Sequence, residues 1–367
     1  MPRRITVRER LQAGCSRRPQ SDRNDLMDSS YLLVLVVVAA IAFDMMNGFH
    51  DGCNAVSTCI YTKALKPHVA ILISAAFNFV GPFLGIQVAK TIGGVINFSP
   101  GGEHVDPNQM AKLVIAAMIG ALLWDLLTWL WGMPVSSSHA LVGGLLGAGI
   151  MALGFDGVKW TKLSEVLAAL IFSPVIGMLV GLVLMTISKR ILAALRLDIE
   201  RADSFYKKMQ IFSSSFVSFT HGSNDATKVM GIIALFLAAH YNYSEIYVPV
   251  WVIIACAAAM AFGTYLSVTS MRLVRTLGEG ITTLHPVHGF SAETGAAAVI
   301  FTASRLGLPV STTHVVTSAV TGTGVASGFG SVGWRTFRDI ILAWLITLPF
   351  CAGVAAASYY VLSIFSG

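Results

Sequence analysis

The stretch Asn47-Gly-Phe-His-Asp-Gly-Cys-Asn-Ala-Val-Ser-Thr58 decides the fold, because the chain carries a variant of it a second time. The second copy reads His221-Gly-Ser-Asn-Asp-Ala-Thr-Lys-Val-Met-Gly231 and places Asp225 174 positions after Asp51. Each copy groups a carboxylate with amide and histidine side chains inside an otherwise apolar region. Polar groups in such surroundings are costly and are usually directed toward a cavity or a partner.

A second pair of motifs recurs at almost the same offset. Pro134-Val-Ser-Ser-Ser-His139 and Pro309-Val-Ser-Thr-Thr-His314 are 175 positions apart. Two different polar motifs that recur at nearly one offset indicate two copies of one structural unit. The sequence therefore predicts a duplicated protein whose polar signature lies within the duplication.

The composition indicates a membrane protein. Of the 367 residues, 55% are hydrophobic and 12% are charged, whereas about 25% are charged in ordinary soluble domains. Four runs contain no Asp, Glu, Lys, Arg or His: 69–89, 166–188, 248–271 and 340–365. Each is long enough to cross a bilayer as a helix of about 20 residues. We therefore expect a multi-pass integral membrane protein in contact with the lipid bilayer.

The net charge of +6 does not indicate nucleic-acid binding, because the cations concentrate in an N-terminal arm and a central loop. We expect no nucleic-acid partner. The five cysteines form no CxxC pair and no zinc-like spacing, so they predict neither a disulfide framework nor a cysteine metal site. No cofactor is expected.

Four regions follow from the polarity of the chain. Residues 1–30 form a polar, arginine-rich arm that we expect to be disordered. Residues 31–189 form a first transmembrane repeat, and 190–210 form a charged central loop. Residues 211–367 form a second repeat.

The expected fold is all-α, with about ten to twelve membrane segments. The pieces at 139–154, 211–220, 229–240 and 313–329 are short and rich in Gly, Ser or Thr, so we expect re-entrant hairpin halves or broken helices there. An odd number of segments in each half makes the halves antiparallel. This arrangement is the inverted repeat found in many secondary transporters.

The two acidic motifs predict a cation site. Oxygen-rich groups on Asp51, Asn54, Asn224 and Asp225 suit Na⁺, and an aspartate alone can carry H⁺. The residues that could support this site are Asp44, His50 and Lys228. A structural alternative is a clamp in which Asp225 pairs with Lys228 and Asn54 caps a helix.

The hydroxyl motifs predict an anion site. Its candidate residues are Ser136, Ser137, Ser138, Ser311, Thr312 and Thr313. Each cluster follows Pro-Val and precedes an apolar run, as the N-terminus of a helix does. Helix N-termini carry free N–H groups and a partial positive charge, and they bind phosphate-like anions. Simple capping would explain one copy. Two copies at the offset of the acidic motifs favour a binding site.

Five further polar residues have less specific predictions. His139 and His314 end the hydroxyl motifs and are expected to orient neighbouring groups by hydrogen bonding. Asp125 could line the cavity. Glu293 could pair with Arg305 to stabilise the fold.

Four motifs together resemble the inorganic phosphate transporter (Pit) family. They are Asn47-Gly-Phe-His-Asp-Gly-Cys-Asn-Ala-Val-Ser-Thr58, Pro134-Val-Ser-Ser-Ser-His-Ala-Leu-Val-Gly143, Gly222-Ser-Asn-Asp-Ala-Thr-Lys-Val-Met-Gly231 and Arg305-Leu-Gly-Leu-Pro-Val-Ser-Thr-Thr-His314. The likeness extends from about residue 31 to the end of the chain, and the His50-Asp51 version is most similar to bacterial members.

The resemblance implies symport of inorganic phosphate with H⁺ or Na⁺, an inverted-repeat fold, a homodimer and a location in the bacterial plasma (inner) membrane. It carries over Asp51, Asn54, Asn224 and Asp225 as coupling-cation and substrate residues, with Na⁺ as a possible ligand. It also carries over Ser136–Ser138 and Ser311–Thr313 as phosphate contacts. Two departures exist: the family usually has Asn where Asp125 stands, and the central loop is short.

Other functions fit parts of the pattern. Sulfate, another tetrahedral oxyanion, would suit the same hydroxyls, and a neutral metal–phosphate complex is a further candidate substrate. A membrane hydrolase would need a Ser-His-Asp triad, but no Gly-x-Ser-x-Gly elbow is present and each serine cluster adjoins its histidine. We therefore do not expect an enzyme. A receptor or structural membrane protein would show no uptake after reconstitution.

Overall fold

The computed structural model describes residues 20–99, 105–196, 198–269 and 280–365, together with 274, 276 and 278. All of its regular elements within these residues are helices, accompanied by two isolated β-bridges, Ile96 with Val158 and Thr282 with Val332. The predicted all-α fold is thus confirmed.

The first half of the chain contains α2 (Gln20–Asp51), η1 (Asn54–Val56), α3 (Ser57–Tyr61), α4 (Pro67–Val80), η2 (Gly81–Leu84), α5 (Gln87–Gly93), α6 (Pro107–Trp131), α7 (Ser137–Leu153), η4 (Phe155–Gly157) and α8 (Trp160–Leu195). The second half contains α9 (Ile199–His240), α10 (Val250–Leu266), η5 (Ser267–Thr269), α12 (Pro286–Arg305), α13 (Thr312–Ser327), η6 (Phe329–Ser331) and α14 (Trp334–Phe365).

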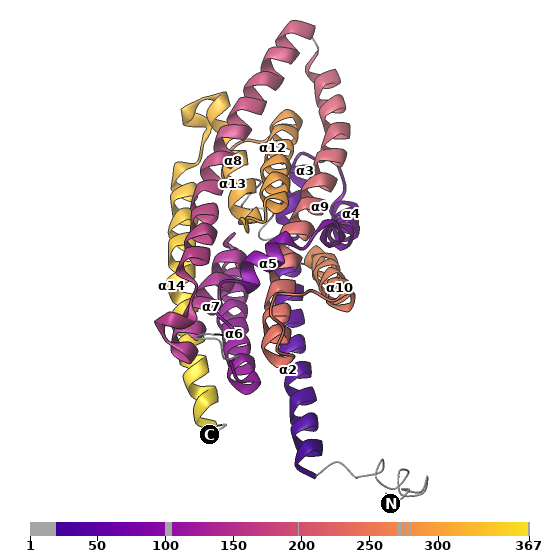
Figure 1. Cartoon of the computed structure of the whole chain (residues 1–367). Helices are drawn as coiled ribbons and strands as arrows, with labels where there is room; N and C mark the ends of the chain where they lie inside the picture. The colour runs from indigo at the N-terminus through magenta and orange to yellow at the C-terminus, as the bar shows by residue number, and fades with distance from the viewer. Residues whose placement is uncertain are drawn as a thin grey trace, which may run out of the picture.

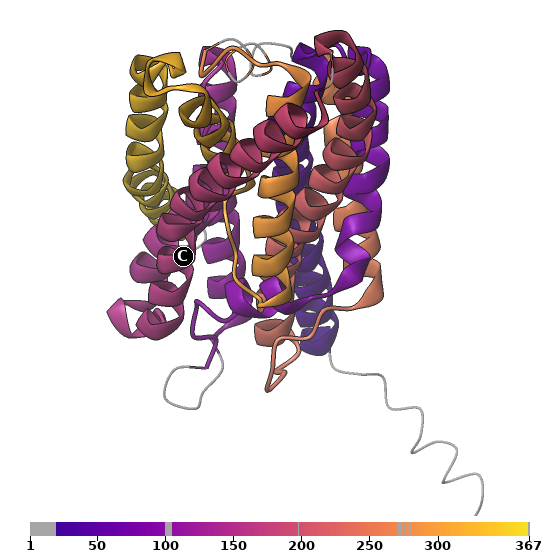
Figure 2. The same cartoon turned by 90° about the horizontal axis from the view of Figure 1, so that it is seen from above.

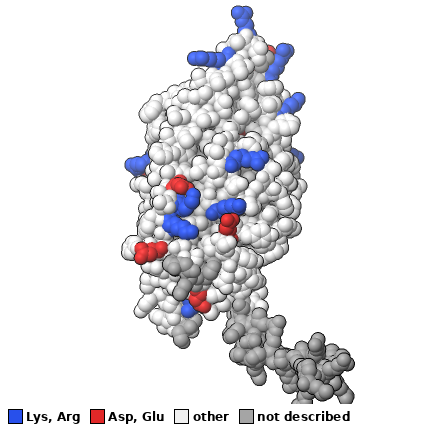
Figure 3. Space-filling view, in the orientation of Figure 1, with Lys and Arg blue, Asp and Glu red and all other residues white. Residues whose placement is uncertain are grey.

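The helices form an elongated bundle, and α8 and α9 extend beyond the rest as a long hairpin at the top of Figure 1. Figure 2 shows the same bundle from above. Among the described residues, five helical spans are long and apolar enough to cross a membrane. Large apolar side chains such as Phe172 on α8 and Leu345 on α14 are exposed, and much of the face in Figure 3 carries no charge. These outward apolar surfaces suit a lipid environment, as expected.

In each half, the helix that follows the hydroxyl motif (α7 or α13) packs against the long last helix of the other half (α14 or α8). Helix α7 contacts α14 as well as its neighbour α6, and α13 contacts α8 as well as α12. Glycines allow the close approach. A Cβ built at Gly147 would lie 2.0 Å from the carbonyl oxygen of Ala352, and one at Gly322 would lie 2.0 Å from that of Met178. Small residues at helix contacts are typical of membrane bundles.

Two predictions about the middle of the chain are wrong. Residues 211–220 and 229–240 are not separate broken pieces, because α9 runs unbroken from Ile199 to His240. Residues 190–210 are not a loop, since α8 continues to Leu195 and α9 begins four residues later. The hydroxyls of this region bond within the helix: Ser218 donates to the carbonyl of Ser214 and Thr227 to that of Ser223. These bonds satisfy the hydroxyls inside the helix, so the polar composition does not require a break.

The N-terminal arm falls mostly outside the described residues. Its disorder was predicted for residues 1–30, of which residues 1–19 are not described. Helix α2 already begins at Gln20, so the last part of the arm is helical and the prediction is wrong there.

Candidate functional site

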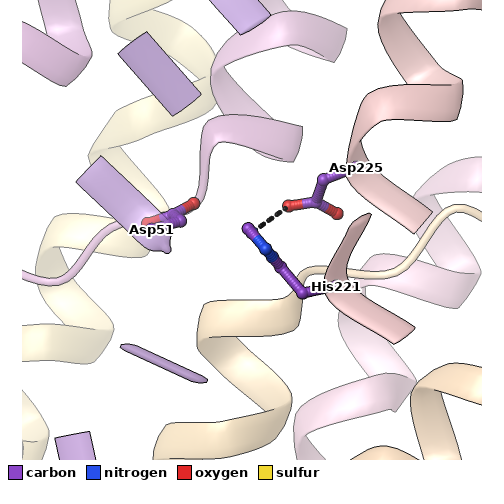
Figure 4. Close-up of side chains that lie close together, drawn as sticks. All are labelled: Asp51, His221 and Asp225. Carbon is purple, nitrogen blue, oxygen red and sulfur yellow. Dashed lines mark ion pairs between the residues drawn. The ribbon is translucent and has the colours of Figure 1, made fainter. Parts of the chain in front are cut away.

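The two repeated aspartates meet in the interior of the bundle. Asp51 is the last residue of α2, whereas Asp225 lies in the middle of α9. Each is 2% exposed. One carboxylate oxygen of each aspartate and one ring nitrogen of His221 all lie within 4.8 Å of one another (Figure 4). Among the described residues, this group has the spacing needed to surround a cation.

The hydroxyl motifs form the N-termini of α7 and α13, as predicted. Ser136 is the N-cap of α7 and accepts a hydrogen bond from the backbone N–H of His139 at 3.1 Å. Ser311 is the N-cap of α13 and accepts one from the backbone N–H of His314 at 3.3 Å. All six hydroxyl residues of the two clusters are buried. We call residues 136–138 and 311–313 the two hairpin tips.

Each aspartate is bonded to the hairpin tip of its own half. Ser137 donates from Oγ to Oδ2 of Asp51 at 3.0 Å. Thr312 donates from Oγ1 to Oδ1 of Asp225 at 3.2 Å. Because Thr312 lies 175 positions after Ser137, the two contacts join corresponding positions of the repeated motifs.

A second pair of contacts crosses between the halves. Asn54 donates from Nδ2 to Oγ1 of Thr313 at 3.1 Å, and Lys228 donates from Nζ to Oγ of Ser138 at 2.5 Å. Asn54 also donates to Oδ1 of Asp51 at 3.1 Å. Each hairpin tip is therefore held by acidic-motif residues from both halves.

Each aspartate also has a histidine neighbour. Nδ1 of His50 lies 2.8 Å from Oδ1 of Asp51, and Nε2 of His221 lies 3.4 Å from Oδ2 of Asp225. The other ring nitrogens meet Thr128 at 3.3 Å and Asn78 at 2.8 Å. These contacts fix the ring orientations beside the carboxylates.

The sequence reasoning did not single out Asn78 or Thr128. Each was detectable as an isolated polar residue, Asn78 inside the charge-free run 69–89 and Thr128 one turn after Asp125. At an offset of 174 positions, Asn78 corresponds to the apolar Val252, whereas Thr128 corresponds to Thr302. Both nevertheless orient the histidines of the site.

Several buried polar atoms around the cluster have no hydrogen bond of normal geometry within the described part of the chain. They include both carboxylate oxygens of Asp44 and of Asp125, and Oδ1 of Asn47 and Asn224. The amide nitrogen of Asn224 donates to Oγ of Ser304 at 2.9 Å. Oxygens without donors leave capacity for cations or water.

Three predicted supporting residues lie away from the carboxylate cluster. The rings of His139 and His314 contact each other with centroids 4.6 Å apart, and His314 stacks on Trp344 at 3.6 Å. Both histidines line an apolar hollow of about 580 Å³ between α8 and α14. Glu293 accepts hydrogen bonds from Thr58, Gln210 and Ser213.

The predicted pairing of Glu293 with Arg305 is wrong. Arg305 instead donates to the carbonyl oxygen of Leu84 at 3.5 Å and lies over the ring of Phe301 at 5.3 Å. Both carboxylate oxygens of Glu293 instead accept hydrogen bonds from hydroxyl and amide donors. Arg305 therefore remains at the exposed end of α12.

Known proteins match the sequence of this chain over most of its length. The sequence pattern described as the phosphate transporter family matches residues 47–355. The chain belongs to the phosphate transporter family. A probable low-affinity inorganic phosphate transporter of Rhizobium meliloti (strain 1021) is 42% identical over 332 residues, which cover 90% of this chain and 96% of that protein. One of Bacillus subtilis (strain 168) is 40% identical over 337 residues, covering 91% and 98%.

A solved structure has the same fold as this phosphate transporter family member. The structure described as the sodium-dependent phosphate transporter matches with a TM-score of 0.80 and 26% identity, over 91% of this chain and 99% of that one. The resemblance found in the sequence is confirmed. The relatives are named as transporters, so the predictions of a membrane transporter rather than an enzyme are also confirmed.

Proposed function

We propose that this protein imports inorganic phosphate by symport with a cation, H⁺ or Na⁺, through alternating access. One observation carries the proposal: two hairpin tips and two repeated aspartates form one buried cluster in which each tip contacts both halves. The family and the names of its relatives support phosphate as the substrate. The named sodium dependence of the structural neighbour supports a cation.

The hairpin tips supply the groups that phosphate needs. The N-termini of α7 and α13 offer backbone N–H donors with a partial positive charge, and Ser137 and Thr312 add hydroxyls. Both hydroxyls now donate to carboxylates. A cation that coordinates the Asp51 carboxylate oxygens displaces the Ser137 hydroxyl from Oδ2, and this hydroxyl is then free to donate to phosphate. Cation binding thus completes the anion site, and this order couples the two fluxes.

The energetics require cotransport. Divalent phosphate that enters a cell against 100 mV costs about 4.6 kcal/mol, because each charge costs about 2.3 kcal/mol. Two accompanying positive charges cancel this cost, and a third makes uptake electrogenic. The buried carboxylates at the site give those cations a place beside the anion.

The duplication provides a way to expose the site alternately to the two sides of the membrane. We propose that residues 31–189 and 211–367 are inverted repeats that move relative to each other around the shared site, and that two copies of the chain form a homodimer. The hydrogen bonds that cross between the halves, from Asn54 to Thr313 and from Lys228 to Ser138, support the first part because motion of one half changes the site of the other.

Uptake of radiolabelled phosphate by proteoliposomes tests the function. Purified protein is reconstituted, and sodium and pH gradients are imposed separately. We expect uptake under at least one gradient and its loss in Asp51→Asn. The matched control Asp156→Asn removes an exposed carboxylate that belongs to none of the four motifs. It should retain wild-type uptake. Wild-type uptake by Asp51→Asn would overturn the assignment.

Two further measurements distinguish free phosphate from sulfate and from a metal–phosphate complex as the transported substrate. An excess of sulfate should leave phosphate uptake unchanged if phosphate is the substrate, whereas competition would indicate a general oxyanion transporter. Removal of Mg²⁺ and Ca²⁺ by chelation should also leave uptake unchanged for free phosphate. Loss of uptake on chelation would indicate that a neutral metal–phosphate complex is carried instead.

A further inference from the structure

Lys228 is a buried lysine whose ammonium group is surrounded by oxygens. Its side chain is 2% exposed. Nζ lies 2.6 Å from Oδ1 of Asp225, 2.6 Å from the carbonyl oxygen of Val310 and 2.5 Å from Oγ of Ser138. An ammonium has three donors, so all three are used. The group is therefore fully coordinated by the protein.

The three oxygens are the kinds that hold a hard cation. Carboxylate, backbone carbonyl and oxygen-bearing side chains are the ligands that such cations take in proteins. A lysine ammonium is a compact point charge, so it can occupy a place of this kind. Its tether to α9 means that it cannot be exchanged or transported.

The equivalent position in the first half has no charge. Asn54 lies 174 positions before Lys228, and its amide donates to Oδ1 of Asp51 and to Oγ1 of Thr313. Each aspartate also has a histidine beside it, His50 at 2.8 Å from Asp51 and His221 at 3.4 Å from Asp225. The halves differ in that a lysine ammonium contacts Asp225, whereas the equivalent residue beside Asp51 is an uncharged amide.

We propose that the Lys228 ammonium replaces a transported cation at Asp225, so that exchangeable cations bind on the Asp51 side. This inference rests on the proposed phosphate symport and specifies its cation sites. The sequence predicted that both aspartates bind a transported cation. The Lys228 ammonium already neutralises the carboxylate of Asp225, so only Asp51 keeps that role. An uncharged amide at position 228 would open a second exchangeable site and add one transported cation for each phosphate.

The variant Lys228→Asn tests this in proteoliposomes. The number of charges moved with each phosphate is obtained from the membrane potential at which net flux is zero, at fixed Na⁺, pH and phosphate gradients. We expect Lys228→Asn to move one more positive charge per phosphate than the wild type, carried by Na⁺. An unchanged charge number and an unchanged response to Na⁺ would overturn the proposal.

Lys189→Asn is the matched control. Nζ of Lys189 donates to the carbonyl oxygen of Ala326 at 2.9 Å and to Oγ of Ser327 at 3.0 Å, so it also binds a carbonyl and a hydroxyl. No carboxylate is among these contacts. We expect its charge number to equal that of the wild type. A wild-type protein that takes up no phosphate would count against the proposed function and not against the role of Lys228.

Thermal unfolding in detergent keeps the proposal testable if Lys228→Asn does not transport. Na⁺ should substitute for the missing ammonium, so the melting temperature of the variant should rise in sodium chloride relative to choline chloride by more than that of the wild type. Binding of ²²Na⁺ to the purified variant should show one additional site per chain. Equal destabilisation in both salts, without added Na⁺ binding, would overturn the proposal.

Discussion

The amide of Asn54 and the ammonium of Lys228 each donate a hydrogen bond to the hairpin tip of the opposite half of the chain, to Thr313 and to Ser138. The two donors are 174 positions apart in the sequence. Neither half therefore completes the site alone. A site built in this way is sensitive to any relative movement of the halves, as alternating access around a shared site requires.

Removal of the Ser137 hydroxyl should weaken phosphate binding. In the proposed mechanism this hydroxyl leaves Asp51 and donates to the anion, and a hydrogen bond to a charged group contributes about 1.5–3 kcal/mol. We expect Ser137→Ala to raise the KM for phosphate uptake about tenfold or more. Ser164→Ala removes an exposed hydroxyl that bonds only to its own helix, to the carbonyl of Thr161, and should have no effect. A KM within twofold of wild type would contradict the role of Ser137.

A methyl group at Gly147 should destabilise the protein. The added Cβ would lie 2.0 Å from the carbonyl oxygen of Ala352, so α7 and α14 would have to separate. We expect Gly147→Ala to lower the free energy of unfolding by about 2 kcal/mol, within the range of about 1–3 kcal/mol for overpacked cores. Gly353→Ala is the control, because a Cβ there has nothing within 4 Å. Equal melting temperatures for the two variants in detergent would argue against close packing of these helices.

Replacement of Glu293 should affect stability more than transport. Its carboxylate accepts hydrogen bonds from Thr58, Gln210 and Ser213, and each buried donor left without an acceptor costs about 1–3 kcal/mol. We expect Glu293→Ala to melt several degrees lower and to retain the wild-type KM for phosphate. The exposed Glu165, whose surface ion pair with Lys162 contributes little, supplies the control Glu165→Ala. A raised KM without a stability loss would instead place Glu293 in the transport path.

The carboxylate of Asp125 should strengthen cation binding. Both of its oxygens are buried without a hydrogen bond of normal geometry among the described residues, and its charge interacts with those of His50 and Asp51. We expect Asp125→Asn to raise the concentration of coupling cation that gives half-maximal uptake, by about fivefold or more. The exposed Asp156→Asn should not change it. An unaltered half-maximal concentration in Asp125→Asn would show that this extra carboxylate has no part in cation binding.

Repetition made much of this protein predictable. Ser136 and Ser311 could be recognised as helix N-caps because capping is local and the two copies support each other. The charge-free runs 69–89, 166–188 and 340–365 likewise predicted helices long enough to cross a membrane, whereas 248–271 contains the shorter α10. The phosphate transporter family followed from four motifs in order, and the comparisons confirm it.

Other features depend on contacts that no local pattern records. The bond of Thr58 to Glu293 joins residues 235 positions apart, and the repeat places the apolar Ile232 where a second Thr58 would be. Helix α9 was divided wrongly because its serines and threonines suggested breaks. Their hydroxyls instead bond to carbonyls one turn earlier in the same helix, which a polarity pattern alone does not reveal.

An experimental structure with phosphate and the coupling cation bound tests the central claim most directly. We predict density for the anion between the N-termini of α7 and α13, in contact with the Ser137 and Thr312 hydroxyls, and density for a cation beside Asp51. Anion density away from both hairpin tips, with Ser137 still bonded to Asp51, would contradict the account.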